Sequence, residues 1–262
     1  MATYLDRILE AHRAAAAADP RPLDGLVAAA RSAPPARGFA SALERHATDG
    51  LAVIAEVKRR SPSKGDLAAD LDPAAVAADY VAGGATCLSV LTDKDWFGGS
   101  PADLQAARAA VPVPVLRKDF TVDARDVADA RLMGADAVLL IVAALDDAEL
   151  ADFHALGTEL GLDVLVEVHD EAELQRALAV GATLVGVNQR DLVTFEVDTD
   201  RAVRVGRAMP PGIVRVAESG VRGPEDAARL AAAGFHAVLV GESVVTSGDR
   251  QAAVRALRAA AG

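Results

Sequence analysis

Several apolar segments of this chain end in side chains that can donate or accept protons. The stretch VPVPVLRKDF (111–120) begins with valines that belong in a core and ends in charged residues around Lys118. Two other apolar segments, DVLVEV and IVRVAES, carry Glu167 and Glu218 near their ends. A lysine close to a carboxylate supplies the acid and the base that proton-transfer chemistry requires. We therefore expect a site that moves protons, if the fold brings these segment ends together.

The same kind of ending recurs along most of the chain. Seven of eight apolar runs end in polar or ionisable groups: Glu56 with Lys58, Thr92 with Asp93, Lys118, Glu167, Asn188 with Arg190, Glu218 with Ser219, and Gly241 with Glu242 and Ser243. A single buried glutamate is usually an ion-paired structural residue. Each buried charge carries a desolvation cost, however, which only pairing or a ligand offsets. A ring of lysines, glutamates and an asparagine therefore predicts an active site.

The elements that position these residues alternate regularly. Apolar runs rich in Val, Ile and Leu occupy residues 51–57, 86–92, 113–118, 136–142, 163–168, 183–188, 213–219 and 236–242. Between them lie helical stretches, several of which begin with Asp, Ser or Pro and end in Gly, as helix caps do. Runs with little polar alternation are typical of parallel strands buried on both faces. Eight such units predict a closed (β/α)8 TIM barrel, whose active site forms at the carboxyl ends of its strands.

A doubly wound open sheet is the alternative fold. Such a sheet would be expected to carry a glycine-rich turn, G-x-G-x-x-G, after its first strand, and none follows residues 51–57. Residues 1–48 stand outside the repeat, and we expect them to form a helical extension of a single domain, 1–262, whose barrel spans 49–262. We favour an extension that plugs the bottom of the barrel or packs on its side, and a substrate-capping role stays open.

Composition excludes several classes of protein. The net charge of −11 argues against a nucleic-acid partner, because neutralising phosphates needs a basic face. No apolar run reaches the roughly 18 residues of a membrane span, and the N-terminus lacks the pattern of a signal peptide. We expect a cytoplasmic monomer in which the single cysteine, Cys87, is buried. The five histidines show no metal-ligand spacing, and only His169 is expected near the mouth, where it helps to start a helix.

Lysine is scarce in this chain and is informative for that reason. Of the 27 basic residues, only Lys58, Lys64, Lys94 and Lys118 are lysines. An arginine is not deprotonated in a protein, whereas a lysine can release its proton. The lysines therefore point to positions where an arginine will not serve.

Two features predict an anionic, phosphorylated small molecule as the substrate. Gly220 and Gly241 follow the last two runs and let backbone N–H groups approach a ligand, with Ser219 and Ser243 beside them. Helix N-termini attract anions, and phosphate sites after strands seven and eight are frequent in such barrels. The loop EVKRRSPSKGD after the first run adds four basic residues, which in so acidic a chain are expected to attract an anionic substrate.

Eight segments of the chain match the motifs of a known family in order and spacing. They are IAEVKRRSPSKGD, SVLTDKDWFGGS, PVLRKDF, LLIVAAL, LVEVH, GVNQRDL, AESGV and VLVGESVVTSGD. Together they closely resemble indole-3-glycerol-phosphate synthases, from about residue 4 to the end of the chain. The resemblance implies a lyase of tryptophan biosynthesis that converts 1-(2-carboxyphenylamino)-1-deoxyribulose 5-phosphate to indole-3-glycerol phosphate, releasing CO2 and water. It implies neither a metal nor an organic cofactor.

The resemblance also implies roles for the catalytic residues. Lys118 matches the general acid of the family, and Glu167 matches the carboxylate that shuttles protons during dehydration. Glu56 and Lys58 match a pair that assists the chemistry and holds the anionic groups of the substrate. Glu218 matches a second carboxylate, which completes an alternating arrangement of positive and negative groups. Such neighbours would tune the pKa values of the acid and the base toward neutrality.

Further residues are implied to bind the substrate. Ser61 matches a contact to the substrate carboxylate, while Asn188 and Arg190 match groups that orient the substrate. Phe120 and Leu192 would line the slot for the anthranilate ring. The residues expected on the phosphate side are Ser219, Gly220, Gly241, Glu242 and Ser243.

Two other functions fit part of this pattern. Another sugar-phosphate enzyme on a phosphate-binding barrel, such as an aminoketose isomerase, would share the glycines after the last two runs. Those isomerases typically use an Asp or Cys acid–base pair, where this chain has Lys and Glu. A non-catalytic binding barrel would be expected to lose the acid or the base, and this sequence keeps both. We therefore favour the synthase.

Overall fold

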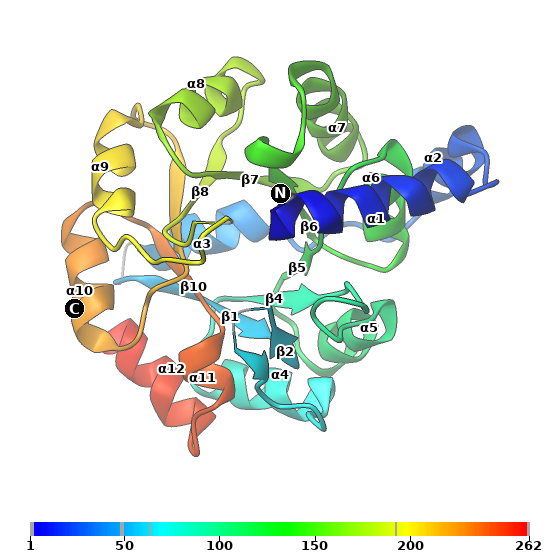
Figure 1. The fold of residues 1–262 in the computed structure, drawn as a ribbon. Coiled ribbons are helices and arrows are strands. Elements are labelled where there is room, and N and C mark those ends of the chain that lie inside the picture. Colours follow the sequence, from blue (N-terminus) through cyan, green and yellow to red (C-terminus); the bar gives the residue numbers. More distant parts are fainter. Residues whose placement is uncertain (1–2, 48–49, 63, 192, 261–262) are drawn as a thin grey trace.

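Eight parallel strands close into a barrel in the computed structural model, which describes residues 3–47, 50–62, 64–191 and 193–260 (Figure 1). The barrel strands are β1 (Ala52–Val57), β4 (Cys87–Leu91), β5 (Val115–Lys118), β6 (Ala137–Ile141), β7 (Asp163–Val168), β8 (Leu184–Asn188), β9 (Val214–Glu218) and β10 (Ala237–Val240). They pair in the order β1-β10-β9-β8-β7-β6-β5-β4, and β1 also pairs with β4. The predicted (β/α)8 TIM barrel is therefore confirmed.

The strands form where the sequence places its apolar runs, because they are covered on both faces. Every residue of β1, β4 and β6 is buried, and each predicted run contains one observed strand. Side chains inside the barrel and helices outside it exclude water from both faces. A strand in that position has no polar face to show in its sequence.

Helices surround the barrel, and their starts follow the expected capping chemistry. They are α4 (Pro73–Ala82), α5 (Pro101–Ala110), α6 (Ala124–Leu132), α7 (Asp147–Glu159), α8 (Glu171–Ala179), α9 (Arg201–Ala208), α10 (Pro224–Ala232), the short α11 (Glu242–Val245) and α12 (Arg250–Ala259), with a 3-10 turn, η1, at Val142–Ala144. The side chains of Ser100, Asp146 and Asp170 accept hydrogen bonds from the first turns of α5, α7 and α8. These bonds satisfy backbone N–H groups that a helix start leaves open. None of the described helices is both long and apolar enough to span a membrane.

The loop after β1 contains a small antiparallel hairpin that the sequence did not predict. Its strands are β2 (Arg60–Ser61) and β3 (Gly65–Asp66). Arg59 donates to Asp103 and to the carbonyl of Leu71, and Arg60 donates to the carbonyl of Trp96. These two arginines hold the loop against its neighbours. Arg59 and Arg60 do not line the cavity described below, whereas Lys58 and Lys64 do. The expectation that this loop attracts an anionic substrate stays a prediction.

Two of the N-terminal helices, α2 (Leu23–Arg31) and α3 (Phe39–Ala47), pack against the barrel or its helices, away from the carboxyl ends of the strands. Phe39 and Leu43 of α3 are fully buried, and the backbone N–H of Ala40 donates to Asp163, the first residue of β7, at 3.0 Å. Thus α3 closes the amino end of the barrel, while α2 packs against α6. The predicted boundary between 48 and 49 falls on two residues outside the described part of the chain.

The remaining N-terminal helix, α1 (Tyr4–Ala18), lies at the opposite, carboxyl end. Figure 1 shows it in blue, crossing in front of β6. The ring of Tyr4 packs edge-on against Trp96 at 5.1 Å and against Phe195 at 5.3 Å. These two rings belong to the loops after β4 and β8. The sequence favours an N-terminal extension that plugs the bottom of the barrel, and α3 does so. By contrast, α1 lies where a helix would have to lie to cap the substrate, which is the alternative that the sequence leaves open.

Candidate active site

A cavity of about 650 Å³ opens at the carboxyl ends of the strands. Every sequence-predicted site residue that the structure describes lines it: Glu56, Lys58, Ser61, Lys118, Phe120, Glu167, Asn188, Arg190, Glu218, Ser219, Gly220, Gly241, Glu242 and Ser243. The remaining one, Leu192, lies outside the described residues. The barrel brings these residues together because parallel strands present their carboxyl ends on one side.

Lys118 lies at the centre of the cavity, between two buried carboxylates. Its Nζ is 3.0 Å from Oε2 of Glu167 and 3.3 Å from Oε2 of Glu218. Burial alone would lower the pKa of Lys118, but the negative charges of Glu167, Glu218 and Glu56 outweigh it and raise the pKa. Its pKa therefore moves away from neutrality, contrary to the expectation from the sequence, because the three carboxylates favour the ammonium. Lys118 is protonated before substrate arrives, as a general acid must be.

Glu167 is held as a carboxylate. Burial would raise its pKa, but the charges of Lys118 and His169 and a hydrogen bond from Asn188 lower the pKa below its ordinary value. The Nδ2 of Asn188 donates to Oε1 of Glu167 at 3.0 Å, and Oδ1 of Asn188 accepts from the backbone of Arg190. Asn188 thereby fixes the orientation of the carboxylate at the end of β8.

Glu218 has the opposite ionisation tendency. Burial raises its pKa, the Lys118 ammonium opposes that shift, and the nearby Glu167 carboxylate adds to it. Its Oε1 has no hydrogen-bond partner among the described residues. A Cβ on Gly186 of β8 would overlap this oxygen, so a glycine is needed there to make room for Glu218. The two carboxylates that flank Lys118 thus differ, one held ionised and one inclined to keep a proton.

A second charged pair lines the wall next to the β1 loop. Nζ of Lys58 is 2.5 Å from Oε1 of Glu56, whose side chain is only 5% exposed. A Cβ on Gly241 would overlap this carboxylate, so Gly241 is needed for close packing against Glu56 as well as for ligand approach. The hydroxyl of Ser61 is buried and has no hydrogen-bond partner among the described residues. Lys58 and Ser61 can therefore both donate to an anionic group in the cavity.

The phosphate-side residues form a cradle between β9 and β10. Ser219 and Gly220 both have positive φ angles, 63° and 73°. The carbonyl of Ser219 accepts from Gln189 at 2.7 Å, and the hydroxyl of Ser243 donates to the carbonyl of Val221 at 3.2 Å. The first bond ties the loop after β9 to the end of β8, and the second ties that loop to the first turn of α11. The first N–H groups of a helix are left open for an anion.

Aromatic side chains form the outer wall of the cavity. Phe97 and Phe120 face each other with ring centroids 6.2 Å apart, and Phe195 lines the cavity from the loop after β8. Only 3% of the residues are aromatic, so this concentration is marked. Such a wall suits a flat ring. Sequence reasoning identified Phe120 but missed Phe97 and Phe195, although both follow barrel strands in rim loops.

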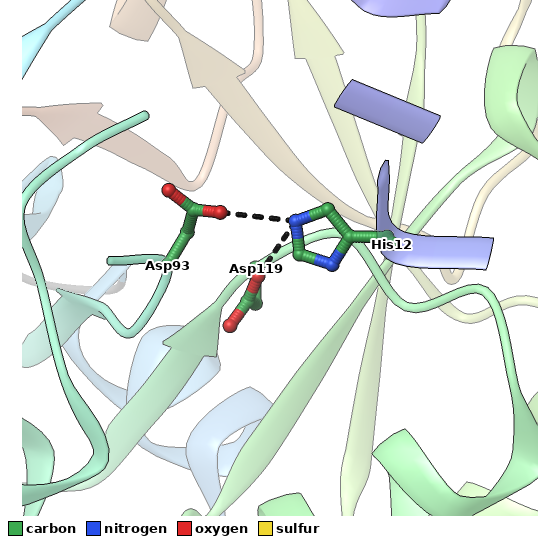
Figure 2. Close-up of side chains that lie close together, drawn as sticks. All are labelled: His12, Asp93 and Asp119. Carbon is green, nitrogen blue, oxygen red and sulfur yellow. Dashed lines mark hydrogen bonds and ion pairs between the residues drawn. The ribbon is translucent and has the colours of Figure 1, made fainter. Parts of the chain in front are cut away.

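His12 is a second histidine at the mouth, contrary to the expectation that only His169 would lie there. Figure 2 shows its imidazole facing Asp93 and Asp119, with Nε2 3.0 Å from Oδ2 of Asp93 and 4.0 Å from Oδ1 of Asp119. The other oxygen of Asp93 accepts from the backbone of Trp96, and Asp119 accepts from Arg117. Each of the three side chains therefore has a polar partner within the protein. They anchor α1 over the cavity.

Comparisons with known proteins agree with one another. The sequence model of a family described as indole-3-glycerol phosphate synthase matches residues 5–257. A relative of that name from Nocardioides sp. is 58% identical over 206 residues, which cover 79% of each chain. Another, from Rhodococcus jostii, is 52% identical over 96% of this chain and 93% of its own. A third, from Paenarthrobacter aurescens, is 52% identical over 88% of this chain and 86% of its own.

A solved structure shares the fold. Thiamine phosphate pyrophosphorylase from Pyrococcus furiosus superposes with a TM-score of 0.61, covering 82% of this chain and 96% of its own. The two sequences are 15% identical. This likeness concerns the barrel and carries no argument about the reaction.

Proposed function

The chain belongs to the indole-3-glycerol phosphate synthase family, and on that premise we propose how its residues carry out the reaction. The enzyme is a ring-closing carboxy-lyase that converts 1-(2-carboxyphenylamino)-1-deoxyribulose 5-phosphate to indole-3-glycerol phosphate, CO2 and water. One observation carries the assignment of roles: Lys118 lies between Glu167 and Glu218, within 3.3 Å of a carboxylate oxygen of each. An acid and a base are thus in contact before substrate binds.

The first step is ring closure, for which Lys118 is the general acid. An aromatic carbon attacks the ketone carbon of the substrate, and negative charge develops on the ketone oxygen. Lys118 donates a proton to that oxygen. The surrounding carboxylates keep the lysine charged until then, and Glu167 remains beside it as an acceptor.

The second step removes the substrate carboxyl group as CO2 and restores the aromatic ring. Lys58 and Ser61 hold this carboxylate, because an ammonium and an unpartnered buried hydroxyl face the same part of the cavity. Glu56 keeps Lys58 in place through their ion pair. The binding of this group also orients the aromatic carbon toward the ketone.

The third step is dehydration. Lys118, once reprotonated, donates a proton to the hydroxyl, which leaves as water, and a proton from the ring or the nitrogen must be removed. Glu167 accepts that proton, and Asn188 keeps its carboxylate oriented. Glu218, whose pKa burial raises, is placed to return a proton to the shared network around Lys118.

The ends of the substrate are held by the walls of the cavity. The phosphate binds backbone N–H groups of the cradle formed by Ser219, Gly220, Gly241, Glu242 and Ser243. The hydroxyl of Ser219 adds a donor, whereas the hydroxyl of Ser243 already donates to the carbonyl of Val221. Glu242 contributes its backbone, because its carboxylate is turned toward Lys64 at 3.8 Å. Phe120 covers the anthranilate ring together with Leu192, and Arg190 orients the substrate beside Asn188.

We also propose that residues 1–262 act as one domain and as a monomer in the cytoplasm, without a metal or organic cofactor. One chain supplies both the acid and the base of the site, which supports a self-contained protomer. Sedimentation velocity during turnover tests the oligomeric state. Activity that appears only in a dimer peak would contradict the monomer.

The assay that tests the proposed function is direct. Purified protein is mixed with the carboxyphenylamino substrate, and formation of indole-3-glycerol phosphate is followed by fluorescence. We expect product formation with stoichiometric release of CO2. An aminoketose isomerase would instead convert a phosphoribosylamine to the corresponding aminoketose without releasing CO2. Observing that reaction, and no indole-3-glycerol phosphate, would overturn the assignment.

A further inference from the structure

His169 follows β7 and stands behind Glu167, outside the cavity wall. Its side chain is only 12% exposed, and its Nε2 lies 3.7 Å from Oε1 of Glu167. This Nε2 has no hydrogen-bond partner among the described residues. Its other ring nitrogen, Nδ1, is 3.0 Å from Oε2 of Glu173 on α8. One imidazole therefore bridges a carboxylate of the site and a carboxylate of a surrounding helix.

The position of Glu173 is fixed by the start of α8. Its backbone N–H donates to the side chain of Asp170 at 2.8 Å, and its carboxylate accepts from the backbone N–H of His169 at 2.7 Å. The helix cap thus holds the carboxylate that receives Nδ1–H of His169. The imidazole is oriented by this bond, which leaves Nε2 pointing toward Glu167.

This geometry favours the doubly protonated ring. With Nδ1–H donating to Glu173, a neutral imidazole would direct the Nε2 lone pair at the buried Glu167 carboxylate. A second proton on Nε2 replaces that repulsion with attraction. Burial alone would lower the pKa of His169, but Glu173 and Glu167 raise it, while Arg201 on α9 opposes them. Glu167 also faces Lys118, Asn188 and Glu218.

We propose that His169, held by Glu173, is a positioning residue that keeps Glu167 ionised and oriented for its proton transfers. His169 does not touch the cavity and acts through Glu167. Glu167 can then lose its proton after each transfer, because the imidazolium charge stabilises the carboxylate that is restored. This inference rests on the proposed function, since it assigns His169 a part in the same reaction.

The test compares pH profiles of kcat/KM for the parent, His169→Gln and His169→Leu. Both variants remove the positive charge, so Glu167 should bind its proton more tightly. An opposite charge within about 4–6 Å lowers a carboxyl pKa by about one unit or more. We expect the acid limb of both profiles to move up by about one pH unit, with kcat above that limb within a few-fold of the parent.

Two further variants keep the test decisive. Glu173→Gln leaves His169 in place and keeps a side-chain acceptor for the backbone N–H of His169, but removes the charge that favours the imidazolium. It should move the acid limb in the same direction by a smaller amount. His154→Gln is the matched control, because His154 lies on α7 and does not line the cavity. Its profile should coincide with that of the parent.

Thermal unfolding of each variant separates misfolding from loss of function. An acid limb that is unchanged in His169→Gln, His169→Leu and Glu173→Gln would overturn the proposal. So would activity lowered equally at every pH in a folded variant, which indicates a structural role. Failure of the parent to form indole-3-glycerol phosphate would instead contradict the proposed function, so the two failures are distinguishable.

Discussion

The two ends of the barrel both bury charged groups, but they satisfy them differently. At the amino end, Asp136 is fully buried and accepts from the backbone N–H groups of Arg37 and Val115, both at 2.8 Å. It also accepts from the guanidinium of Arg108 at 2.9 Å. At the carboxyl end, Glu218 is just as buried, yet its Oε1 has no partner among the described residues. The amino end is therefore built for stability, and the carboxyl end retains groups for a ligand.

Among the described residues, the carboxyl end differs from the amino end in having unpartnered buried polar atoms beside a cavity. A buried polar atom without a partner costs about 1–3 kcal/mol. Such atoms occur at both ends, and Oγ1 of Thr86 and Nε of Arg108 are examples at the amino end. At the carboxyl end, however, the hydroxyl of Ser61 and the Oε1 of Glu218 belong to residues that line the cavity, and the Nε2 of His169 points toward Glu167. A protein tolerates this cost where substrate or a proton transfer uses the group. The α3 plug and its hydrogen bonds to the barrel supply compensating stability at the other end.

The largest effect on the free energy of unfolding should come from breaking the amino-end network. Asp136→Asn removes the charge that pairs with Arg108 and places an NH2 group against donors. Breaking a buried pair costs about 3–5 kcal/mol, and the low end applies because the Arg108 side chain is 22% exposed and can reach water. Urea unfolding measures this loss, while kcat of the folded fraction should stay within about twofold. A kcat that falls while the free energy of unfolding is unchanged would contradict the claim that Asp136 serves stability and not catalysis.

A smaller effect should follow from filling the space beside Glu218. Gly186→Ala places a methyl group where Oε1 of Glu218 lies, so this carboxylate must turn away from Lys118. Misplacing a reacting group by about 1 Å can cost about 10²-fold. We expect kcat to fall by about 10–100-fold. Gly248→Ala is the control, because a Cβ there meets no atom within 4 Å. Equal activity of both variants would show that Glu218 is not positioned by this glycine.

The smallest effect should come from releasing α1 from the mouth. Burial alone would lower the pKa of His12, but its bond to Asp93 and the charge of Asp119 raise it. A raised pKa means that the protonated ring stabilises the fold below the unfolded pKa, about 6.5. This contribution is lost as pH rises through the higher folded value.

His12→Asn should therefore destabilise the protein at pH 5.5 more than at pH 9. Thermal melts at several pH values measure this difference between parent and variant. The expected change in KM is about two- to fivefold, in keeping with the 0.2–1 kcal/mol of a partly exposed pair. A difference in melting temperature that grows with pH would refute the anchoring role.

The fold was largely predictable because the barrel strands are buried on both faces. Continuous Val, Ile and Leu runs identified all eight of them, and caps such as Ser100 and Asp146 identified the helices that follow. The hairpin of β2 and β3 has two residues per strand, too few for a period to appear.

The site residues that lie at the carboxyl ends of strands could be predicted from the sequence. Those on other elements were harder to predict. Lys118, Glu167 and Glu218 could be placed together because all barrel strands point the same way. His12 could not, because it reaches Asp93 from a helix outside the repeat, 81 residues earlier. The need for Gly186 becomes visible only when the side chain of Glu218 is in place. Chain order records which element a residue belongs to, but not which side chains meet across the mouth.

The proposed mechanism depends most on Lys118 as a proton donor held between two carboxylates. Lys118→Arg keeps the positive charge for Glu167 and Glu218 but does not release a proton under these conditions. The direct measurement is kcat and KM of this variant, with urea unfolding as a check on folding. Loss of a general acid typically costs about 10²–10⁴-fold in rate. We predict a kcat lower by that factor, with KM and stability much less altered. A folded Lys118→Arg enzyme that turns over within a few-fold of the parent would contradict the proton-donor role.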